Sequence, residues 1–404
     1  MGLAKDKRMV VLYDRVGPYH HARLSALCHR VNLTAVEFSA VDKAYAWDLI
    51  RDTGDYRRVT LFKDKPIWMH SSATVITRLK RVLNELDPNV VVIPGWDAPA
   101  ALIALQWCLE TRIPSVLLSD SQEIDQQRVW WKEMIKGRIV RLHSAGFVGG
   151  APHIAYLVKL GMPESKICTG CDVVDNNYFA TEAGLVRHDE STRVRFGLPK
   201  NYFLASSRFI EKKNLPLLFQ AYADYSAKAR ERSWGLVLLG DGPLKPQLME
   251  LLKKLRLDKK VILPGFKQYA DLPAYYGSAG AFVHTSTSEQ WGLVINEAMA
   301  CGLPVIVSSQ CGCVPDLVRH GHNGFVFNPD DCDELSHCLF HVASAECDRT
   351  AMGEAGRKII SKFSPESYAS SLCKAAVIAM KVARPMFGYS DKVILGSLIH
   401  RQRI

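Results

Sequence analysis

The sequence predicts an α/β protein made of two Rossmann-like domains, each built on a doubly wound parallel sheet. Short apolar runs bounded by Gly, Pro, Asp or Ser alternate with longer helical patterns along the whole chain. Runs such as residues 90–93 (Val-Val-Val-Ile) and 236–239 (Leu-Val-Leu-Leu) are continuously apolar, which is typical of parallel strands covered on both faces. The length of 404 residues suits two domains of about 100–200 residues each.

The candidate strands form two groups along the chain. In the first half they are residues 9–13, 33–38, 59–62, 90–94, 115–119 and 145–148. In the second half they are residues 202–206, 235–240, 261–265, 281–285 and 304–308. Helical patterns separate these strands, which favours doubly wound sheets. Ligands in this architecture bind outside the carboxyl ends of the strands, so we expect the two domains to face a central cleft.

The boundary between the domains is expected in residues 181–200. This segment is polar and charge-rich, has little apolar periodicity, and precedes a new strand at Tyr202. We therefore expect an N-terminal domain over residues 1–190 and a second domain over 200–384. Residues 385–404 follow a long helical stretch and are expected to form a C-terminal helix.

The composition excludes several classes of function and location. Lys and Arg number 51 against 41 Asp and Glu, which gives a net charge of +10. This charge is dispersed and accompanies no nucleic-acid motif, so no nucleic-acid partner is expected. The N-terminus is too charged for a secretory signal, and no run reaches the roughly 18 apolar residues of a membrane span. We expect a cytoplasmic protein, at most peripheral to the inner face of a membrane.

No metal site is expected from the cysteines. The chain has 11 cysteines, an odd number at low density, which indicates reduced thiols. Two close pairs, Cys168 with Cys171 and Cys311 with Cys313, each lack a second pair at the spacing of a zinc site.

Common nucleotide and hydrolase motifs are missing. The dipeptide Gly-Lys does not occur, so there is no P-loop, and neither His-Glu-x-x-His nor Gly-x-Ser-x-Gly is present. Gly240 and Gly242 begin a Gly-x-Gly pattern, but Pro243 follows, which indicates a turn after a strand and not a dinucleotide fingerprint. A dehydrogenase is therefore not expected.

The strongest motif places two carboxylates eight residues apart. Glu289 is expected in a loop, and Glu297 on a helix that opens near Gly292. A helix start offers free backbone N–H groups and a positive dipole end, which suit a phosphate. Glu289 and Glu297 would then accept hydrogen bonds from hydroxyls on either side, as a sugar nucleotide requires. The alternative is a surface capping glutamate and a solvated helix face.

A second motif joins Arg208 and Lys213 in the loop after the first strand of the second half. The two cations can converge on one anion, since Arg grips two phosphate oxygens and Lys adds a point charge. The alternative is a solvated charged turn.

Candidate substrate-contacting residues follow strands of the first half. Gly17 comes after the first strand, where a glycine lets a ligand approach the backbone, and Tyr19, His20 and His21 are adjacent. A turn glycine with surface histidines is the alternative. Two further strands end near residues expected to point into the same cleft: Trp96, Asp97 and Asp120.

Together these residues resemble family 4 of the retaining, nucleotide-sugar-dependent glycosyltransferases, which have the GT-B fold. In the second half the resemblance rests on ordered blocks: 207–214, 239–243, 263–266, 289–306 and 312–324. In the first half it is looser and rests on Gly17 and residues 160–163 and 172–179.

The resemblance implies a role for each charged residue of these motifs. Arg208 and Lys213 would neutralise the diphosphate and stabilise it as it leaves. Glu289 would bind hydroxyls of the transferred sugar, and Glu297 would bind the ribose. Many members carry His-Asp where this chain has Ser-Asp at 119–120, so Asp120 or His21 would substitute for that histidine.

The resemblance also implies how the backbone would hold the donor. The amides of Gly292 and Leu293 would meet the phosphates, and Gly17 would bring the first domain against the diphosphate. The loop that contacts the base would consist of Gly265, Phe266 and Lys267.

The implied activity is transfer of a sugar from a nucleotide diphosphate sugar, UDP- or GDP-linked, to a hydroxyl acceptor with retention of anomeric configuration. No metal or cofactor is implied. The acceptor would be a small molecule, a glycan or a lipid-linked compound, read by the first domain, and the C-terminal helix would cross back to that domain. A sugar-nucleotide epimerase or a phosphorylase of the same fold is the alternative.

Residues 127–141 join two adjacent tryptophans with Lys and Arg. Basic amphipathic helices of this kind lie on anionic membranes, so peripheral membrane contact is one interpretation. The alternative is an ordinary helix that buries Trp130 or Trp131.

Overall fold

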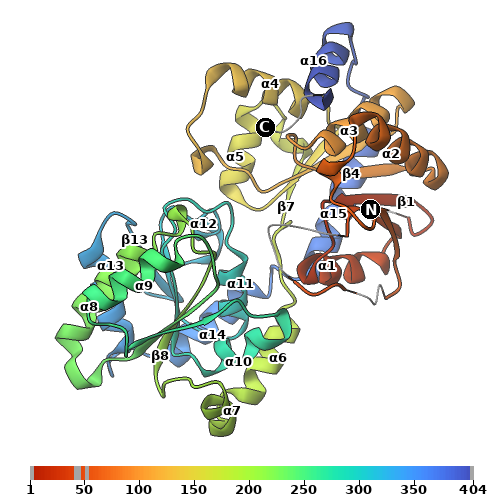
Figure 1. The fold of residues 1–404 in the computed structure, drawn as a ribbon. Coiled ribbons are helices and arrows are strands. Elements are labelled where there is room, and N and C mark those ends of the chain that lie inside the picture. Colours follow the sequence, from red (N-terminus) through yellow and green to blue (C-terminus); the bar gives the residue numbers. More distant parts are fainter. Residues whose placement is uncertain (1–3, 41–46, 51–53, 401–404) are drawn as a thin grey trace. The chain divides into compact units, whose positions relative to one another are not determined.

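The computed structural model describes residues 4–40, 47–50 and 54–400. The chain divides into two compact units. The first consists of Met1–Val173 and Pro365–Ile404, and the second of Val174–Ser364. Figure 1 shows that each unit is a sheet flanked by helices.

The first unit is built on a seven-stranded parallel sheet with the order β3-β2-β1-β4-β5-β6-β7. Its strands are β1 (Arg8–Tyr13), β2 (Asn32–Ser39), β3 (Arg57–Phe62), β4 (Val90–Pro94), β5 (Ser115–Ser119), β6 (Ala145–Val148) and β7 (Ile167–Thr169). Its helices are α1 (Pro18–Cys28), α2 (Ser72–Leu86), α3 (Pro99–Thr111), α4 (Trp130–Arg141), α5 (Ala151–Lys159), α15 (Pro365–Lys381) and α16 (Tyr389–His400).

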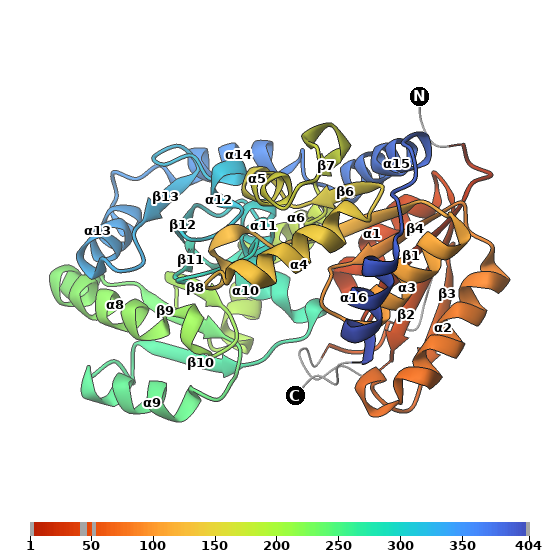
Figure 2. The same ribbon diagram turned by 90° about the horizontal axis from the view of Figure 1, so that it is seen from above.

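Helices cover both faces of this sheet, which accounts for the continuously apolar run in β4. Helix α15 packs across β4 to β7 and against α1. On the other face, α2 and α3 enclose a core with alternate residues of the strands. Helix α16 lies against α3, as Figure 2 shows. No helix in the described part of the chain is long and apolar enough to cross a membrane.

The second unit is built on a six-stranded parallel sheet with the order β10-β9-β8-β11-β12-β13. Its strands are β8 (Tyr202–Ser206), β9 (Gly235–Leu239), β10 (Val261–Gly265), β11 (Ala281–His284), β12 (Val305–Ser308) and β13 (Gly324–Phe327). Its helices are α6 (Asn176–Val186), α7 (Glu190–Arg195), α8 (Leu215–Ala229), α9 (Lys245–Lys254), α10 (Leu272–Ser278), α11 (Leu293–Ala300), α12 (Val314–Leu317), α13 (Cys332–Ala343) and α14 (Arg349–Ile360). Helices α8, α9 and α13 pack on one core, whereas α6, α10, α11 and α14 pack against one another.

Each sheet has one point where the strand order reverses. In the first unit β1 pairs with β2 on one side and β4 on the other. In the second unit β8 pairs with β9 and β11. Connections on the two sides of such a point leave in opposite directions, which opens a crevice at the carboxyl ends of the strands.

The two Rossmann-like sheets agree with the sequence prediction, but two strands were missing from it. Strand β7 has three half-buried residues, and β13 follows a turn at residues 321–323. Both lie at an end of their sheets.

The division into units also differs from the expected boundaries. Residues 174–190 belong to the second unit, because Phe179 on α6 is buried against Tyr269 and Tyr276. Helix α15 belongs to the first unit, where the buried hydroxyl of Tyr368 is 3.0 Å from that of Tyr13 on β1.

Candidate functional site

Lys213 and Glu289 meet at the carboxyl edge of the second sheet, where the strand order reverses. Lys213 lies in the connection after β8, and Glu289 in the connection after β11. Their side chains form an ion pair with about a tenth of each exposed. A small cavity beside the pair is lined by Ser207, His284 and Lys213, among others. The interpretation of Glu289 as a surface capping residue, and of Lys213 as part of a solvated turn, is wrong.

Backbone hydrogen bonds hold both members of the pair in place. The Glu289 amide donates to the carbonyl of Gln310 at 3.2 Å, and the Glu289 carbonyl accepts from Gly312 at 3.0 Å. The Lys213 carbonyl accepts a hydrogen bond from the Thr285 hydroxyl at 2.9 Å. The loops after β8, β11 and β12 therefore form one connected surface.

The Glu289 carboxylate accepts hydrogen bonds from two further buried groups. Nε2 of His284 lies 3.1 Å from Oε2 of Glu289, and the Ser286 hydroxyl lies 3.2 Å from the same oxygen. Burial alone would raise the pKa of Glu289, but the His284 hydrogen bond and the Lys213 charge outweigh it and hold the pKa below its ordinary value. Burial lowers the pKa of His284. Glu289 is therefore an ionised acceptor at neutral pH, next to a neutral imidazole.

Helix α11 begins at Leu293, four residues after Glu289. Gly292 is its N-cap and has φ of 103°, a left-handed conformation that favours glycine. A Cβ at this position would also lie 2.9 Å from Ile295. Leu293 is the first helical residue, so the first backbone N–H groups of α11 are available near the ion pair. The sequence prediction of a helix start at Gly292 is confirmed.

The loop that carries Arg208 rests on a glycine turn after β9. Gly240 and Gly242 have φ of 123° and 158°, and a Cβ on either would collide with the backbone of Ser207 or Phe209. The Phe209 amide donates to the carbonyl of Asp241 at 2.8 Å. This packing explains the Gly-Asp-Gly sequence and fixes the backbone beside Arg208, whose side chain is exposed.

Glu297 lies on the buried side of α11. Glu297 is only 1% exposed, and its carboxylate accepts a hydrogen bond of 2.6 Å from the hydroxyl of Tyr276 on α10. The alternative of a solvated helix face is wrong. The expectation of one glutamate in a loop and one on the helix is confirmed.

The expected base-contacting loop ends β10. Gly265 has φ of 83°, and no atom lies within 4 Å of a Cβ built on it. The side chain of Phe266 is exposed, and the ammonium of Lys267 lies over the ring of Tyr275, 5.6 Å from its centre. An aromatic ring and a cation therefore border an open backbone at this edge.

In the first unit, the candidates near Gly17 surround the start of α1, which follows β1. The Gly17 amide donates to Nδ1 of His20 at 3.1 Å, and a Cβ at Gly17 would meet nothing closer than 3.9 Å. Burial, and then the charge of Arg23, lower the pKa of His20 to about 3. Tyr19 packs edge-on against Trp47, whereas His21 Nδ1 is 3.1 Å from the Tyr56 hydroxyl.

The other acceptor-side candidates have different surroundings. Trp96 is buried in the core against Tyr156, while Asp97 next to it is exposed. Asp120 directly follows β5. Although part of this side chain reaches solvent, the protein atoms around it and the carboxylate of Asp172 raise the pKa of Asp120 to about 7.

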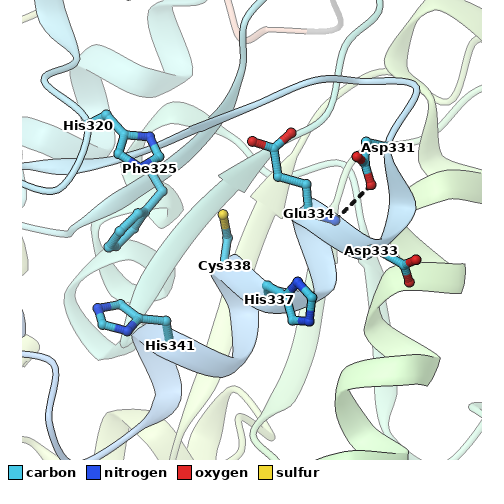
Figure 3. A pocket seen from close by; sticks show the side chains of 8 residues that line it. All are labelled: His320, Phe325, Asp331, Asp333, Glu334, His337, Cys338 and His341. Atoms are coloured by element: carbon cyan, nitrogen blue, oxygen red, sulfur yellow. Dashed lines mark hydrogen bonds between the residues drawn. The ribbon is translucent and has the colours of Figure 1, made fainter.

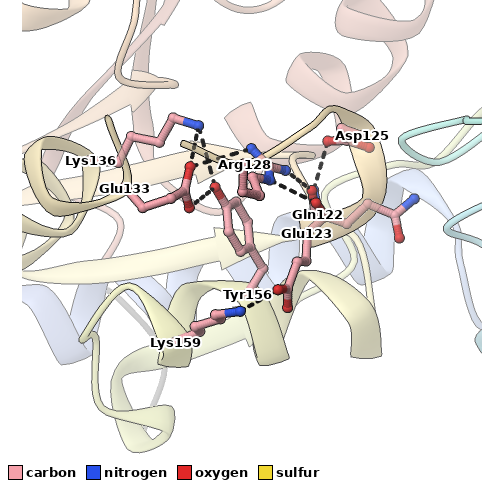
Figure 4. Close-up of polar contacts among 8 residues, drawn as sticks. All are labelled: Gln122, Glu123, Asp125, Arg128, Glu133, Lys136, Tyr156 and Lys159. Carbon is pink, nitrogen blue, oxygen red and sulfur yellow. Dashed lines mark hydrogen bonds and ion pairs between the residues drawn. The ribbon is translucent and has the colours of Figure 1, made fainter. Parts of the chain in front are cut away.

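Helix α4 presents large apolar side chains to solvent. Trp130 is 72%, Trp131 41% and Met134 62% exposed. On the same helix Glu133 accepts hydrogen bonds from Lys136 and from the hydroxyl of Tyr156 on α5, both at 2.8 Å (Figure 4). The contact with Tyr156 joins α4 to α5. The alternative that this helix buries Trp130 or Trp131 is wrong.

A second cavity, of about 530 Å³, lies beside β13 and α13 and is lined by neither residue of the ion pair (Figure 3). Its lining includes His320, His337, Cys338 and His341. The ring of Phe325 is 5.1 Å from that of His341, in a near-perpendicular arrangement. None of the sequence motifs points to this cavity.

Sequence reasoning missed three residues that contact the candidate glutamates: His284, Ser286 and Tyr276. For His284 a signal exists, because it is a polar residue at the carboxyl end of an otherwise apolar strand. The partner of Glu297 comes from α10, and no spacing in the sequence indicates that contact.

Comparison with known proteins gives matches for both the sequence and the fold. Residues 187–359 match the family described as glycosyl transferases group 1. The chain is 34% identical over 155 residues to a sulfoquinovosyl transferase of Arabidopsis thaliana, which covers 38% of this chain and 28% of that protein. It is 30% identical over 156 residues to the alpha-monoglucosyldiacylglycerol synthase of Acholeplasma laidlawii, which covers 38% of each. The chain thus matches about a third of the length of these two relatives.

The structure resembles that of HepE of Anabaena, solved in complex with UDP-glucose. The TM-score is 0.70 at 18% identity, over 92% of this chain and 99% of the other. This likeness shows the fold, and the two Rossmann-like sheets are those of the GT-B fold expected from the sequence.

Proposed function

We propose that the chain, whose residues 187–359 match the glycosyl transferases group 1, transfers a sugar from a nucleotide diphosphate sugar to a hydroxyl acceptor with retention of anomeric configuration. A UDP- or GDP-linked sugar is the proposed donor. The observation that carries this proposal is the Lys213–Glu289 ion pair beside the start of α11, where the strand order of the second sheet reverses.

The two residues of the ion pair are proposed to bind different parts of the donor. The charges of Lys213 and Glu289 pair with each other. A diphosphate competes for the ammonium of Lys213 and gains the N–H groups at the start of α11 and the guanidinium of Arg208. Glu289 then keeps the hydrogen bonds from His284 and Ser286 and can accept others from sugar hydroxyls. Glu297 is proposed to bind the ribose.

The proposed reaction needs no nucleophile from the protein. The bond between the anomeric carbon and the phosphate oxygen breaks while the acceptor oxygen attacks from the same face. The leaving phosphate oxygen takes the proton of the acceptor hydroxyl. Negative charge builds up on the diphosphate as the bond breaks, and Arg208, Lys213 and the α11 start stabilise it, so we propose a metal-independent reaction.

The acceptor is proposed to bind at the carboxyl edge of the first sheet. Gly17 leaves the start of α1 open, and His20, with its lowered pKa, is a neutral imidazole at pH 7. Asp120, with a pKa of about 7, can accept a hydrogen bond from an acceptor hydroxyl. These residues lie after β1 and β5 of the same sheet.

The exposed face of α4 supports a lipid-linked acceptor at an anionic membrane. Trp130, Trp131 and Met134 offer apolar surface, and the exposed Lys132 and Arg141 add positive charge. Such a face binds by burying its apolar side chains and attracting anionic head groups. The relative from Acholeplasma laidlawii is named as a synthase of a glucosyl diacylglycerol, which is a lipid product. The eleven unpaired cysteines support a reducing, cytoplasmic location.

A thermal-shift screen of nucleoside diphosphates and nucleotide sugars tests the proposed function, since a bound donor stabilises the folded chain by mass action. We expect one nucleoside diphosphate and its sugar conjugates to raise the melting temperature. With that donor and an acceptor, the product should carry the anomeric configuration of the donor in an NMR spectrum. An inverted product, or the absence of stabilisation by any nucleotide, would contradict the proposal.

A further inference from the structure

Three potential metal ligands gather at the edge of the first sheet opposite the carboxyl ends of its strands. Cys28 ends α1, His29 follows it, and Asp55 lies just before β3. One ligand atom from each residue lies within 4.8 Å of the others. Within residues 4–40, 47–50 and 54–400 this is the only such group of three. The histidines of the cavity beside α13 do not form one.

The chemical nature of these ligands suits zinc. A thiolate, an imidazole and a carboxylate form a mixed sulfur, nitrogen and oxygen set, which zinc binds and which magnesium or calcium does not prefer. In tetrahedral zinc sites neighbouring ligand atoms are about 3.5 Å apart, as follows from metal–ligand bonds of about 2.0–2.3 Å. Small side-chain rotations therefore bring the three atoms into coordination distance.

We propose that Cys28, His29 and Asp55 bind one zinc ion, with water at the fourth position. The ion can enter from solvent, because His29 and Asp55 are exposed and Cys28 is half-buried. The Cys28 thiol now donates a hydrogen bond of 3.0 Å to the carbonyl of Ser25, which a thiolate on zinc would give up.

The position of the site indicates that the ion would link two segments of the first unit. The ion would tie the carboxyl end of α1 to the segment ahead of β3. Tyr56 follows Asp55, is buried, and contacts His21 on α1 through its hydroxyl. Zinc at one end and this contact at the other would hold α1 against the sheet. The proposal stands apart from the proposed sugar transfer, which takes place at the opposite edge of the strands.

Calorimetric titration of ZnCl₂ into the full chain, freed of metal by a chelator in the presence of a reductant, tests the site. We expect one tightly bound equivalent in the wild type. Cys28→Ser, His29→Asn and Asp55→Asn should each weaken binding at least tenfold. Cys168→Ser and His188→Asn are matched controls on residues of similar exposure and should bind as the wild type does. Cobalt should give a thiolate-to-metal absorption band that Cys28→Ser lacks.

Several outcomes would overturn the proposal. The first is that the wild type binds no zinc tightly. The second is that Cys28→Ser binds zinc as tightly as the wild type does. The third is that only the double variant His337→Asn/His341→Asn loses zinc binding. Circular dichroism of the metal-free variants checks their folding. If Cys28→Ser does not fold, His29→Asn and Asp55→Asn decide the question, because both replace exposed side chains.

Discussion

Lys213 and Glu289 are 76 residues apart in the chain, yet they form an ion pair at the carboxyl edge of the second sheet. The contact follows from the pairing of β8 with β11, because each residue lies in the connection after one of these strands. In our account, a diphosphate takes the place of Glu289 as the main partner of Lys213, and Glu289 becomes available to the sugar.

Arg208→Ala should lower kcat more than it weakens donor binding. The guanidinium is needed most when charge builds up on the leaving diphosphate, and one such donor is typically worth about 10²–10³ in rate. Steady-state kinetics with the donor found in the screen measures the effect. Lys212→Ala is the matched control, since it removes a neighbouring cation that we do not place in the site. A change in kcat of less than about threefold would remove Arg208 from the proposed role.

Sugar transfer should survive treatment with EDTA. In the proposed mechanism, Lys213, Arg208 and the start of α11 supply the positive charge that a metal would otherwise provide. The assay compares initial rates before and after removal of divalent ions. If zinc is bound by Cys28, His29 and Asp55, the same treatment should lower the melting temperature and leave the rate nearly unchanged. Loss of activity that Mg²⁺ or Mn²⁺ restores would contradict the metal-independent mechanism.

The double variant Trp130→Ser/Met134→Ser should bind vesicles rich in anionic lipid at least tenfold more weakly than the wild type. Burial of one large apolar side chain is worth about 1.5–3 kcal/mol, and two such side chains are lost. Co-sedimentation with vesicles measures the binding. Leu185→Ser on α6 replaces a side chain that is 71% exposed and should have no effect. Equal binding by wild type and double variant would exclude α4 as the membrane contact.

Acid should destabilise the wild type through His143, which lies between α4 and β6. Burial lowers the pKa of His143 to about 3, whereas an unfolded histidine has a pKa of about 6.5. Between these pH values the unfolded chain takes up a proton that the folded chain does not. The free energy of unfolding therefore decreases as the pH is lowered, by up to about 1.4 kcal/mol per pH unit.

Thermal unfolding of the wild type and His143→Leu between pH 8 and pH 5 measures this effect. The melting temperature of His143→Leu minus that of the wild type should be constant from pH 8 to pH 7. Below about pH 6.5 this difference should increase, because only the wild type is destabilised by protonation of His143 in the unfolded chain. Parallel curves over the whole range would show that His143 does not control the acid response.

Much of the fold could be predicted because buried parallel strands are continuously apolar. The runs at β4 and β9 show this directly, while the short β7 gave no such signal. The membership of α15 in the first unit could not be predicted, because it depends on a contact between Tyr368 and Tyr13, 355 residues apart.

The site was partly predictable for a related reason. Residues that follow parallel strands gather at one edge of a sheet, so Lys213 and Glu289 could be assigned to the same region. Their direct pairing depends on strand order, which the sequence does not contain. The same holds for Cys28 and Asp55, which meet because β2 and β3 are neighbours in the sheet.

The central claim is that Glu289 and Glu297 hold different ends of one donor. Glu289→Ala should abolish transfer, yet the bare nucleoside diphosphate should bind as tightly as to the wild type or more so, because Lys213 has lost its competing partner. Glu297→Ala should weaken the nucleoside diphosphate and the nucleotide sugar by similar factors of about 10–100, the cost of one charge-assisted hydrogen bond. Tyr276→Phe controls for loss of the contact between Tyr276 and Glu297.

Calorimetric titration of the nucleoside diphosphate into the wild type, Glu289→Ala and Glu297→Ala tests this claim most directly. Melting temperatures without ligand show whether each variant is folded. Our account predicts that only Glu297→Ala loses affinity for the nucleoside diphosphate. If Glu289→Ala weakens the nucleoside diphosphate as much as Glu297→Ala does, the proposed orientation of the donor is wrong.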